Sequence, residues 1–192
     1  FFKITEGESS GLWSVLRSSE DEVLKGSLLI TLYENLRWKT ISPQGFREEM
    51  LAYLPNESNS LLFSMALSYL GDCQRIFPSD SRPLEQVLWK IVTTNPVSQH
   101  RLQAFRLYRS IADSEEAVQR LYTLWQERKA PKDCTLSESD YIGLSYMLAM
   151  HLPEKADKII ATQLSRIQNP DRKKEYQFIS PSVSPRKAER DS

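Results

Sequence analysis

The part of the chain that most clearly decides the fold is residues 137–185, which read SESDYIGLSYMLAMHLPEKADKIIATQLSRIQNPDRKKEYQFISPSVSP. Apolar residues recur at helical spacing over two consecutive segments, which predicts two amphipathic helices placed back to back. Pro153 is expected to open the second helix, and the Asn169-Pro170 pair is expected to close it. A run of charged residues, aromatics and prolines follows. The stretch therefore predicts a helix pair and then a proline-rich turn.

The chain before residue 137 repeats the same helical pattern. Leu24, Leu28, Leu32 and Leu36 form one apolar stripe, which predicts a long amphipathic helix over residues 21–38. Further helices are expected wherever a capping residue or a proline precedes a similar stripe. Two of them are expected over residues 42–55 and 58–76. The next three are expected from the apolar residues within 84–91, before the break at Asn95-Pro96, from those within 104–112, and from those within 118–125, after a capping-box-like start at Asp113.

The connections between these helices favour one fold class. No strand signal appears after residue 10, and short connections predict antiparallel neighbouring helices. The run 135–138, Thr-Leu-Ser-Glu, has the spacing of a capping box and is expected to start the next helix. No helix pair repeats another by residue identity. We therefore predict an all-α fold, an irregular α-superhelix of antiparallel helix pairs that is HEAT/armadillo-like.

The two ends of the chain suggest its domain organisation. Residues 1–10 are predicted to be a linker or the end of a preceding β domain, because Phe1, Phe2 and Ile4 stand before polar turn residues. Residues 11–192 are expected to form one helical C-terminal domain. Because the chain starts on Phe1 rather than Met and stops at Ser192, we expect a piece of a longer polypeptide and a truncated domain.

Charge and cysteine content narrow the class of function. The 192 residues contain 25 Lys and Arg against 25 Asp and Glu, so no overall positive field exists to attract nucleic acid, and no nucleic-acid partner is expected. Cys73 and Cys134 lie far apart and lack a Cys-x-x-Cys companion, so neither a zinc ribbon nor a disulfide framework is predicted. No apolar run reaches the roughly 18 residues of a spanning helix, and no membrane segment is expected.

The sequence predicts no catalytic residue and no metal ligand within this chain. The two histidines, His100 and His151, lack a second histidine or a carboxylate in a metal-ligand pattern, and we expect a structural or surface role for each. A glycine-rich phosphate loop and a nucleophile elbow are also absent from the sequence. On chemistry alone the chain is a helical scaffold without an active site.

The amino-acid sequence of residues 137–185 resembles that of a known protein family. The likeness is carried by the runs 136–141, 163–172 and 178–184, and by the shorter run 32–35 in the first long helix. These runs resemble the C-terminal helical domain of zinc aminopeptidases of the aminopeptidase N type, the gluzincin aminopeptidases, and their bacterial members in particular. The likeness extends over residues 11–191. Ser182 departs from the family, which has alanine at this place.

The resemblance implies a role within a larger metalloprotease. In this family a separate domain with a His-Glu-x-x-His motif and a later glutamate binds Zn²⁺ and activates water, and the hydrolase removes N-terminal residues from peptides. The present chain would be a non-catalytic C-terminal domain that packs on the catalytic domain of its own longer chain and encloses the cavity for the peptide substrate. Zinc would belong to the parent enzyme, and this chain alone is expected to be inactive.

The resemblance also suggests candidates for contact with the substrate. Arg166, Arg172 and Lys173, if they face the cavity, would attract the carboxylate at the far end of the peptide through charge-assisted hydrogen bonds. The simpler interpretation, that Asp171 and Arg172 only cap and pin the turn after Pro170, is preferred.

A second hypothesis places the chain in a different class. It would be a free-standing HEAT-like adaptor that binds a peptide or a partner helix on its concave face. This hypothesis predicts that a separate partner protein is recovered with the chain.

Overall fold

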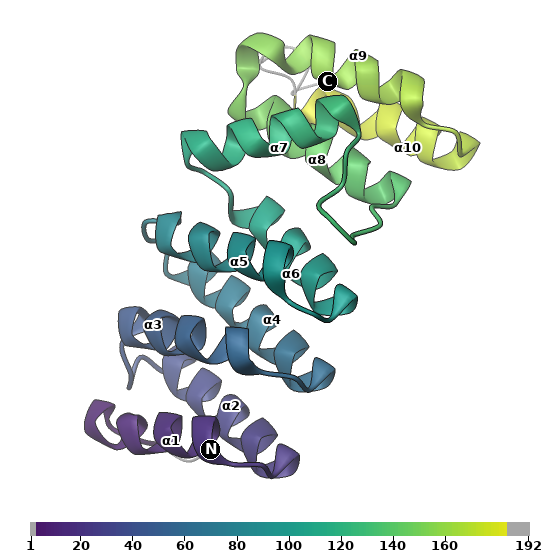
Figure 1. The fold of residues 1–192 in the computed structure, drawn as a ribbon. Helices are drawn as coiled ribbons and strands as arrows, with labels where there is room; N and C mark the ends of the chain where they lie inside the picture. The colour runs from purple at the N-terminus through teal and green to yellow at the C-terminus, as the bar shows by residue number, and fades with distance from the viewer. Residues whose placement is uncertain (1–2, 184–192) are drawn as a thin grey trace. The chain divides into compact units, whose positions relative to one another are not determined.

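The computed structural model describes residues 3–183, and every regular element in this part of the chain is a helix (Figure 1). No β-strand occurs within it, which confirms the predicted all-α class. Phe1 and Phe2, predicted to end a β element, and residues 184–192 at the C-terminal end lie outside the described part.

The helices are joined by short links and by single 3-10 turns. The long helices predicted over residues 21–38, 42–55 and 58–76 are confirmed as α2, α3 and α4, the second of them ending in a 3-10 turn. In chain order the elements are α1 (Glu6–Ser18), α2 (Glu22–Arg37), α3 (Pro43–Tyr53), η1 (Leu54–Asn56), α4 (Ser60–Ile76), α5 (Arg82–Thr94), α6 (Ser98–Ile111), α7 (Glu115–Glu127), α8 (Glu138–His151), η2 (Pro153–Lys155), α9 (Ala156–Arg166), α10 (Pro170–Ile179) and η3 (Ser180–Val183).

Helix α1 begins inside the segment that was expected to be a linker. A capping box starts it, because the backbone N–H of Glu8 donates to the hydroxyl of Thr5 and the carboxylate of Glu8 accepts from the backbone N–H of Thr5. The linker prediction is therefore wrong for residues 6–10. Glycine and serine are weak helix formers, but burial of Trp13 and Leu16 further along α1 outweighs their propensity.

The chain divides into two compact units, residues 1–107 and 108–192, and the division falls within α6. A single helical domain over residues 11–192 stays a prediction, and so does the HEAT/armadillo-like superhelix.

The first unit is a stack of helix pairs (Figure 1). Helix α1 packs on α2 and α3 packs on α4, and α2 joins the two pairs because it contacts both α3 and α4. The ring of Phe63 in α4 stacks on the ring of His100 in α6, with centroids 4.0 Å apart. Gly71 lies at the contact of the same two helices, where a Cβ would lie 2.9 Å from the Cδ1 of Leu107 and would displace the end of that side chain. Helix α4 is therefore enclosed between its neighbours.

The predicted leucine stripe of α2 supplies much of the core of this unit. Of the predicted stripe, Leu28, Leu32 and Leu36 are buried, and Leu29 beside them is buried as well. Leu24, in the first turn of the helix, is 41% exposed, so the stripe is buried only from its second member onward. Burying one leucine side chain contributes roughly 1.5–3 kcal/mol relative to leaving it exposed. The stripe therefore stabilises the first unit through the contacts of α2 with its neighbours.

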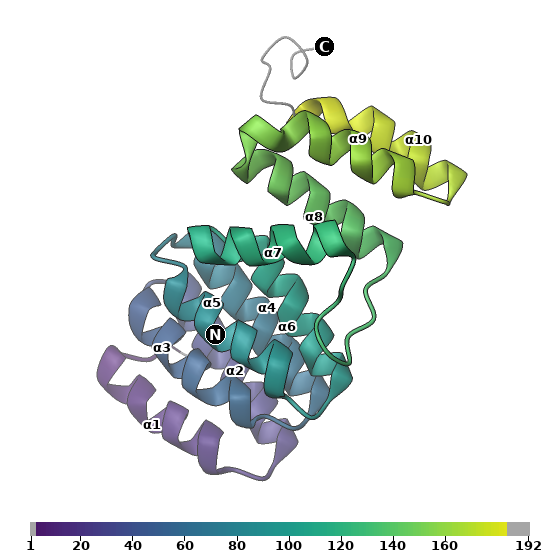
Figure 2. The same ribbon diagram turned by 45° about the horizontal axis from the view of Figure 1, so that its top comes forward.

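The second unit is centred on α8 (Figure 2). Helix α8 packs against α7 and against α9. Its buried residues lie around most of its circumference, as expected for a helix covered on several sides. They are Asp140, Tyr141, Leu144, Ser145, Met147, Leu148 and Ala149.

Helix α10 was not predicted. The Asn169-Pro170 pair follows the end of α9, but it also starts α10, since the side chain of Asn169 accepts from the backbone N–H groups of Asp171 and Arg172, each at 3.0 Å. Pro170 occupies the first helical position, where its missing N–H costs nothing. The hydroxyl of Tyr176, which is buried, lies 2.9 Å from that of Ser145 and attaches α10 to α8. The predicted turn is therefore a helix.

The N-terminus of α8 also differs from the prediction. The capping residue is Ser137 rather than residue 135, because the backbone N–H of Asp140 donates to the Ser137 hydroxyl at 3.2 Å and the Asp140 carboxylate accepts from the Ser137 N–H at 3.0 Å. Residues 135–138 and residues 137–140 both have the spacing of a capping box. The structure uses residues 137–140, and Asp140 is buried there. Pro153, in contrast, begins η2 directly before α9, as expected.

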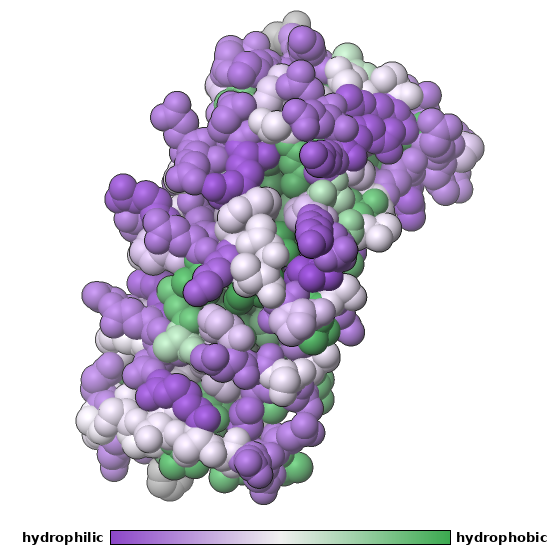
Figure 3. All heavy atoms as spheres, viewed as in Figure 1, coloured by the Kyte–Doolittle hydropathy of each residue, from purple (hydrophilic) through white to green (hydrophobic). Residues whose placement is uncertain are grey.

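The exposed faces of the helices are predominantly polar. On the face drawn in Figure 3, hydrophilic residues cover most of the surface and hydrophobic ones occupy smaller areas between them. Within residues 3–183, no helix combines the length and the apolar character that crossing a membrane would require.

Candidate functional site

Arg166, at the end of α9, binds the C-terminal end of α7. Its Nη1 donates to the carbonyl oxygen of Trp125 at 3.0 Å, and its Nη2 donates to that of Gln126 at 3.2 Å. The guanidinium also lies over the indole of Trp125, 4.9 Å from the ring. Burial lowers the pKa of Arg166, and the nearby charge of Arg128 lowers it further. A cation is favourable at this place, because the last carbonyls of a helix carry partial negative charge.

Arg172 and Lys173 lie in the first turn of α10. The Nη1 of Arg172 is 3.4 Å from the Oε1 of Glu138, a residue of the first turn of α8. The same carboxylate accepts a hydrogen bond from the backbone N–H of Gln168 at 2.7 Å, and this bond, together with Arg172, lowers the pKa of Glu138. Lys173 is exposed to solvent. Glu138 therefore joins the start of α8 to the link before α10.

The three predicted substrate contacts thus have different surroundings. Arg166 binds the end of α7, whereas Arg172 binds the start of α8. Both of these side chains have partners that stabilise the helix packing. The preferred interpretation gave Asp171 and Arg172 the role of capping and pinning the turn after Pro170. The side chain that caps α10 is instead that of Asn169, which accepts from the backbone N–H groups of both residues.

The two histidines lie in different units and have different neighbours. His100 is fully buried, and its Nε2 lies 2.9 Å from the hydroxyl of Ser60. The Nδ1 of His151 lies 3.9 Å from the carboxylate of Asp113. Among residues 3–183 there is no group of three or more His, Cys, Asp and Glu side chains that could hold a metal ion.

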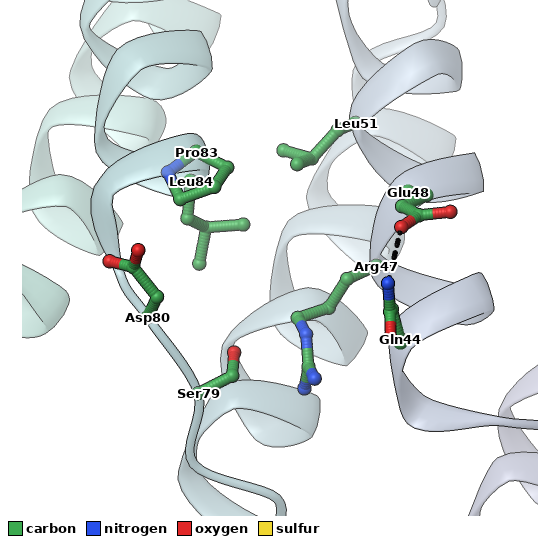
Figure 4. A pocket seen from close by; sticks show the side chains of 8 residues that line it. All are labelled: Gln44, Arg47, Glu48, Leu51, Ser79, Asp80, Pro83 and Leu84. Atoms are coloured by element: carbon green, nitrogen blue, oxygen red, sulfur yellow. Dashed lines mark hydrogen bonds between the residues drawn. The ribbon is translucent and has the colours of Figure 1, made fainter.

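A pocket of about 240 Å³ lies in the first unit, between α3, α5 and the link that joins α4 to α5 (Figure 4). Leu51 from α3 and Leu84 from α5 point into the same space. Arg47 lies at one end of it, beside Ser79. The complete lining is Gln44, Arg47, Glu48, Leu51, Ser79, Asp80, Pro83 and Leu84.

The charged side chains of this pocket are not equivalent. The carboxylate of Asp80 accepts from the Nε, the Nη2 and the backbone N–H of Arg82 at 2.7–3.0 Å, and these bonds lower its pKa. Glu48 accepts from the Nε2 of Gln44 at 3.0 Å. The Nη1 of Arg47 donates to the carbonyl oxygen of Phe77 at 2.9 Å, and within the described residues the structure records no ion pair between Arg47 and a carboxylate.

Sequence reasoning did not find this pocket. Its residues form no motif, and they come from two helices and a link that are distant along the chain. The sequence signal at this place was the break at residues 78–81, which indicated a link between the helices now seen as α4 and α5.

Comparisons with known proteins identify no family for this chain. A scan against models of protein families, a search of curated proteins and a search of solved structures each found no match to this chain.

Proposed function

We propose that this chain is the non-catalytic C-terminal helical domain of a zinc aminopeptidase of the aminopeptidase N type. It would pack on the catalytic domain of the same polypeptide and enclose the cavity that receives the peptide. The Zn²⁺ ion and the water that it activates would belong to that catalytic domain. The main support for the proposal is the resemblance of the amino-acid sequence of residues 137–185 to this family.

The packing of the second unit supports reading the separate resembling runs as parts of one structural unit. The first resembling run contributes Glu138, which accepts a hydrogen bond from Gln168 in the second run. A contact between the hydroxyl groups of Ser145 in α8 and Tyr176 in α10 connects α8 to the helix that follows this link. The runs 136–141 and 163–172 therefore belong to one packed group of helices, whereas the shorter run 32–35 lies in α2 of the first unit.

Among the three candidate contacts, Lys173 fits the proposed role best. The guanidinium of Arg166 already donates to two carbonyl groups, and that of Arg172 already pairs with Glu138. The ammonium group of an exposed lysine has three donors that it can offer to a peptide carboxylate. We propose that Lys173 attracts the carboxylate at the far end of the peptide, while Arg166 and Arg172 stabilise the packing of the helices that line the cavity.

The coding sequence that precedes Phe1 tests the proposal. It should encode a His-Glu-x-x-His motif followed by a further glutamate. A reading frame without that motif would rule the proposal out. Recovery of a separate partner protein bound to the chain would then favour the adaptor hypothesis.

A further inference from the structure

The pocket between α3 and α5 contains Arg47, whose guanidinium group is held through its Nη1 atom. The Nη1 of Arg47 is held by the carbonyl oxygen of Phe77 at 2.9 Å and lies 3.6 Å from the Sγ of Cys73. A guanidinium group has five N–H donors in a planar fork and keeps its charge at all physiological pH values. Arg47 is half-buried and lines the pocket. Its other N–H groups can therefore donate hydrogen bonds to an anion bound there.

The walls beside Arg47 are apolar. Leu51 and Leu84 point into the pocket from the two helices, and Pro83 lies next to Leu84 (Figure 4). The carboxylates of Glu48 and Asp80 point away from this space in the same view. A ligand with an anionic end and a short aliphatic body would therefore find a matching group at each end.

Size and charge define the ligand further. Pockets for drug-sized ligands span roughly 300–1,000 Å³. At about 240 Å³ this pocket is smaller, so it fits a ligand below that size. The lining contains one arginine and two rim carboxylates, of which Asp80 already pairs with Arg82. A dianion such as phosphate would be repelled by these carboxylates more strongly than a monoanion.

We propose that this pocket binds an aliphatic monocarboxylate. The carboxylate accepts hydrogen bonds from the guanidinium of Arg47, and the branched aliphatic end packs against Leu51, Pro83 and Leu84. The proposal concerns the first unit alone and does not depend on the proposed aminopeptidase role.

Titration of the whole chain with small ligands, followed by NMR or calorimetry, tests this site. We expect 4-methylpentanoate to bind and its uncharged analogue, 4-methylpentanamide, to bind at least about tenfold more weakly, because the amide offers the guanidinium one neutral acceptor in place of two charged oxygens. N-acetyl-glycyl-leucine distinguishes two sources of the carboxylate: its binding would identify the end of a peptide chain, and binding of 4-methylpentanoate alone would identify a free acid. Equal binding of acid and amide, or stronger binding of inorganic phosphate than of the acid, would overturn the proposal.

Four variants separate the pocket from the stability of the chain. Arg47→Gln should weaken binding of 4-methylpentanoate by about tenfold or more. Leu51→Glu should weaken it similarly, because it adds a negative charge while Arg47 keeps its bond to Phe77. Glu48→Gln, which removes a rim charge, should leave binding equal or tighten it by about twofold.

The matched control for the arginine substitution is Arg75→Gln, at an exposed arginine that pairs with Asp72 and does not line the pocket. It should leave binding unchanged. Folded Arg47→Gln and Leu51→Glu proteins that bind the acid as tightly as the unchanged chain would contradict the site.

Discussion

The guanidinium of Arg109 lies directly over Gly143, with its Nη1 3.0 Å from the carbonyl oxygen of Asp140. The carboxylate of Asp140 is 3.7 Å from the same nitrogen. A Cβ on residue 143 would lie 2.7 Å from Nη1 and 2.8 Å from Cζ, closer than atoms approach without displacement. Glycine at this position is therefore what allows the end of α6 to be joined to α8.

Gly143→Ala should destabilise the protein, although replacing glycine by alanine inside a helix normally stabilises it by up to about 1 kcal/mol. The added methyl group displaces Arg109 from the nearly buried Asp140, and we expect a loss of about 1–3 kcal/mol. Chemical denaturation measures the change. Gly11→Ala is the matched control, since nothing lies within 4 Å of a Cβ there, and it should stabilise. Equal stabilisation by both substitutions would show that Arg109 does not need the space.

Glu138→Gln should weaken the contact between α8 and the link before α10. The substitution removes the charge that Arg172 and the N–H of Gln168 bind, and we expect a loss of about 1 kcal/mol at pH 7. These bonds lower the pKa of Glu138 in the folded protein. The stabilisation is therefore fully present above the ordinary pKa of about 4.3 and disappears as pH falls through the folded-state pKa. The difference between the two proteins should narrow on acidification.

The control for this substitution is Glu116→Gln. Glu116 pairs with Arg120 one turn along α7 and is 81% exposed, so its contribution should stay below about 0.5 kcal/mol. A loss at Glu116 as large as that at Glu138 would mean that the bond to Gln168 adds nothing.

Arg166→Met should destabilise the second unit by about 1–2 kcal/mol. The substitution keeps an unbranched side chain beside Trp125 but removes the donors to two carbonyl groups and the cation over the indole. Thermal or denaturant unfolding measures this change. Lys173→Met, on the exposed side of α10, should change stability by no more than about 0.5 kcal/mol. A neutral Arg166→Met substitution would contradict the assigned stabilising role.

Acidification should weaken the first unit through His100. Burial lowers the pKa of this imidazole, and the charge of Glu57 partly offsets the effect. The Nδ1 atom has no hydrogen-bond partner, so a proton placed there would lack an acceptor. The unfolded chain therefore binds the proton more readily, and stability should fall as pH drops below the ordinary value of about 6.5, until the folded-state pKa is passed.

His100→Gln isolates this effect, because glutamine does not titrate. The stability of the unchanged protein minus that of the variant should decrease between pH 7.5 and pH 5, two values chosen to span the ordinary pKa of about 6.5. A difference that stays constant, or that increases toward pH 5, would show that protonation of His100 does not oppose folding.

Much of the helical pattern could be predicted from local signals. The predicted leucine stripe identifies α2, although its first member, Leu24, is exposed. The cap formed by Ser42 and Pro43 identifies the start of α3. Both signals act within a few residues, which is why they can be found in the sequence. The errors occur where one signal has two meanings. Asn-Pro both follows one helix and starts another, and burial of Tyr176 selects the second outcome.

The side-chain geometry could not be predicted in the same way. Contacts such as Arg109 with Gly143, or Arg166 with the end of α7, join residues more than 30 positions apart. No spacing rule connects such residues, since the packing of whole helices decides which side chains meet. The pocket between α3 and α5 escaped prediction for the same reason.

An aminopeptidase assay of the complete polypeptide that contains residues 1–192 tests the proposed function most directly. We expect hydrolysis of an aminoacyl arylamide that is abolished by a chelator and restored by Zn²⁺, and no turnover by the isolated chain. Absence of activity in the complete polypeptide, or turnover by the isolated chain that survives purification and chelation, would contradict the proposal.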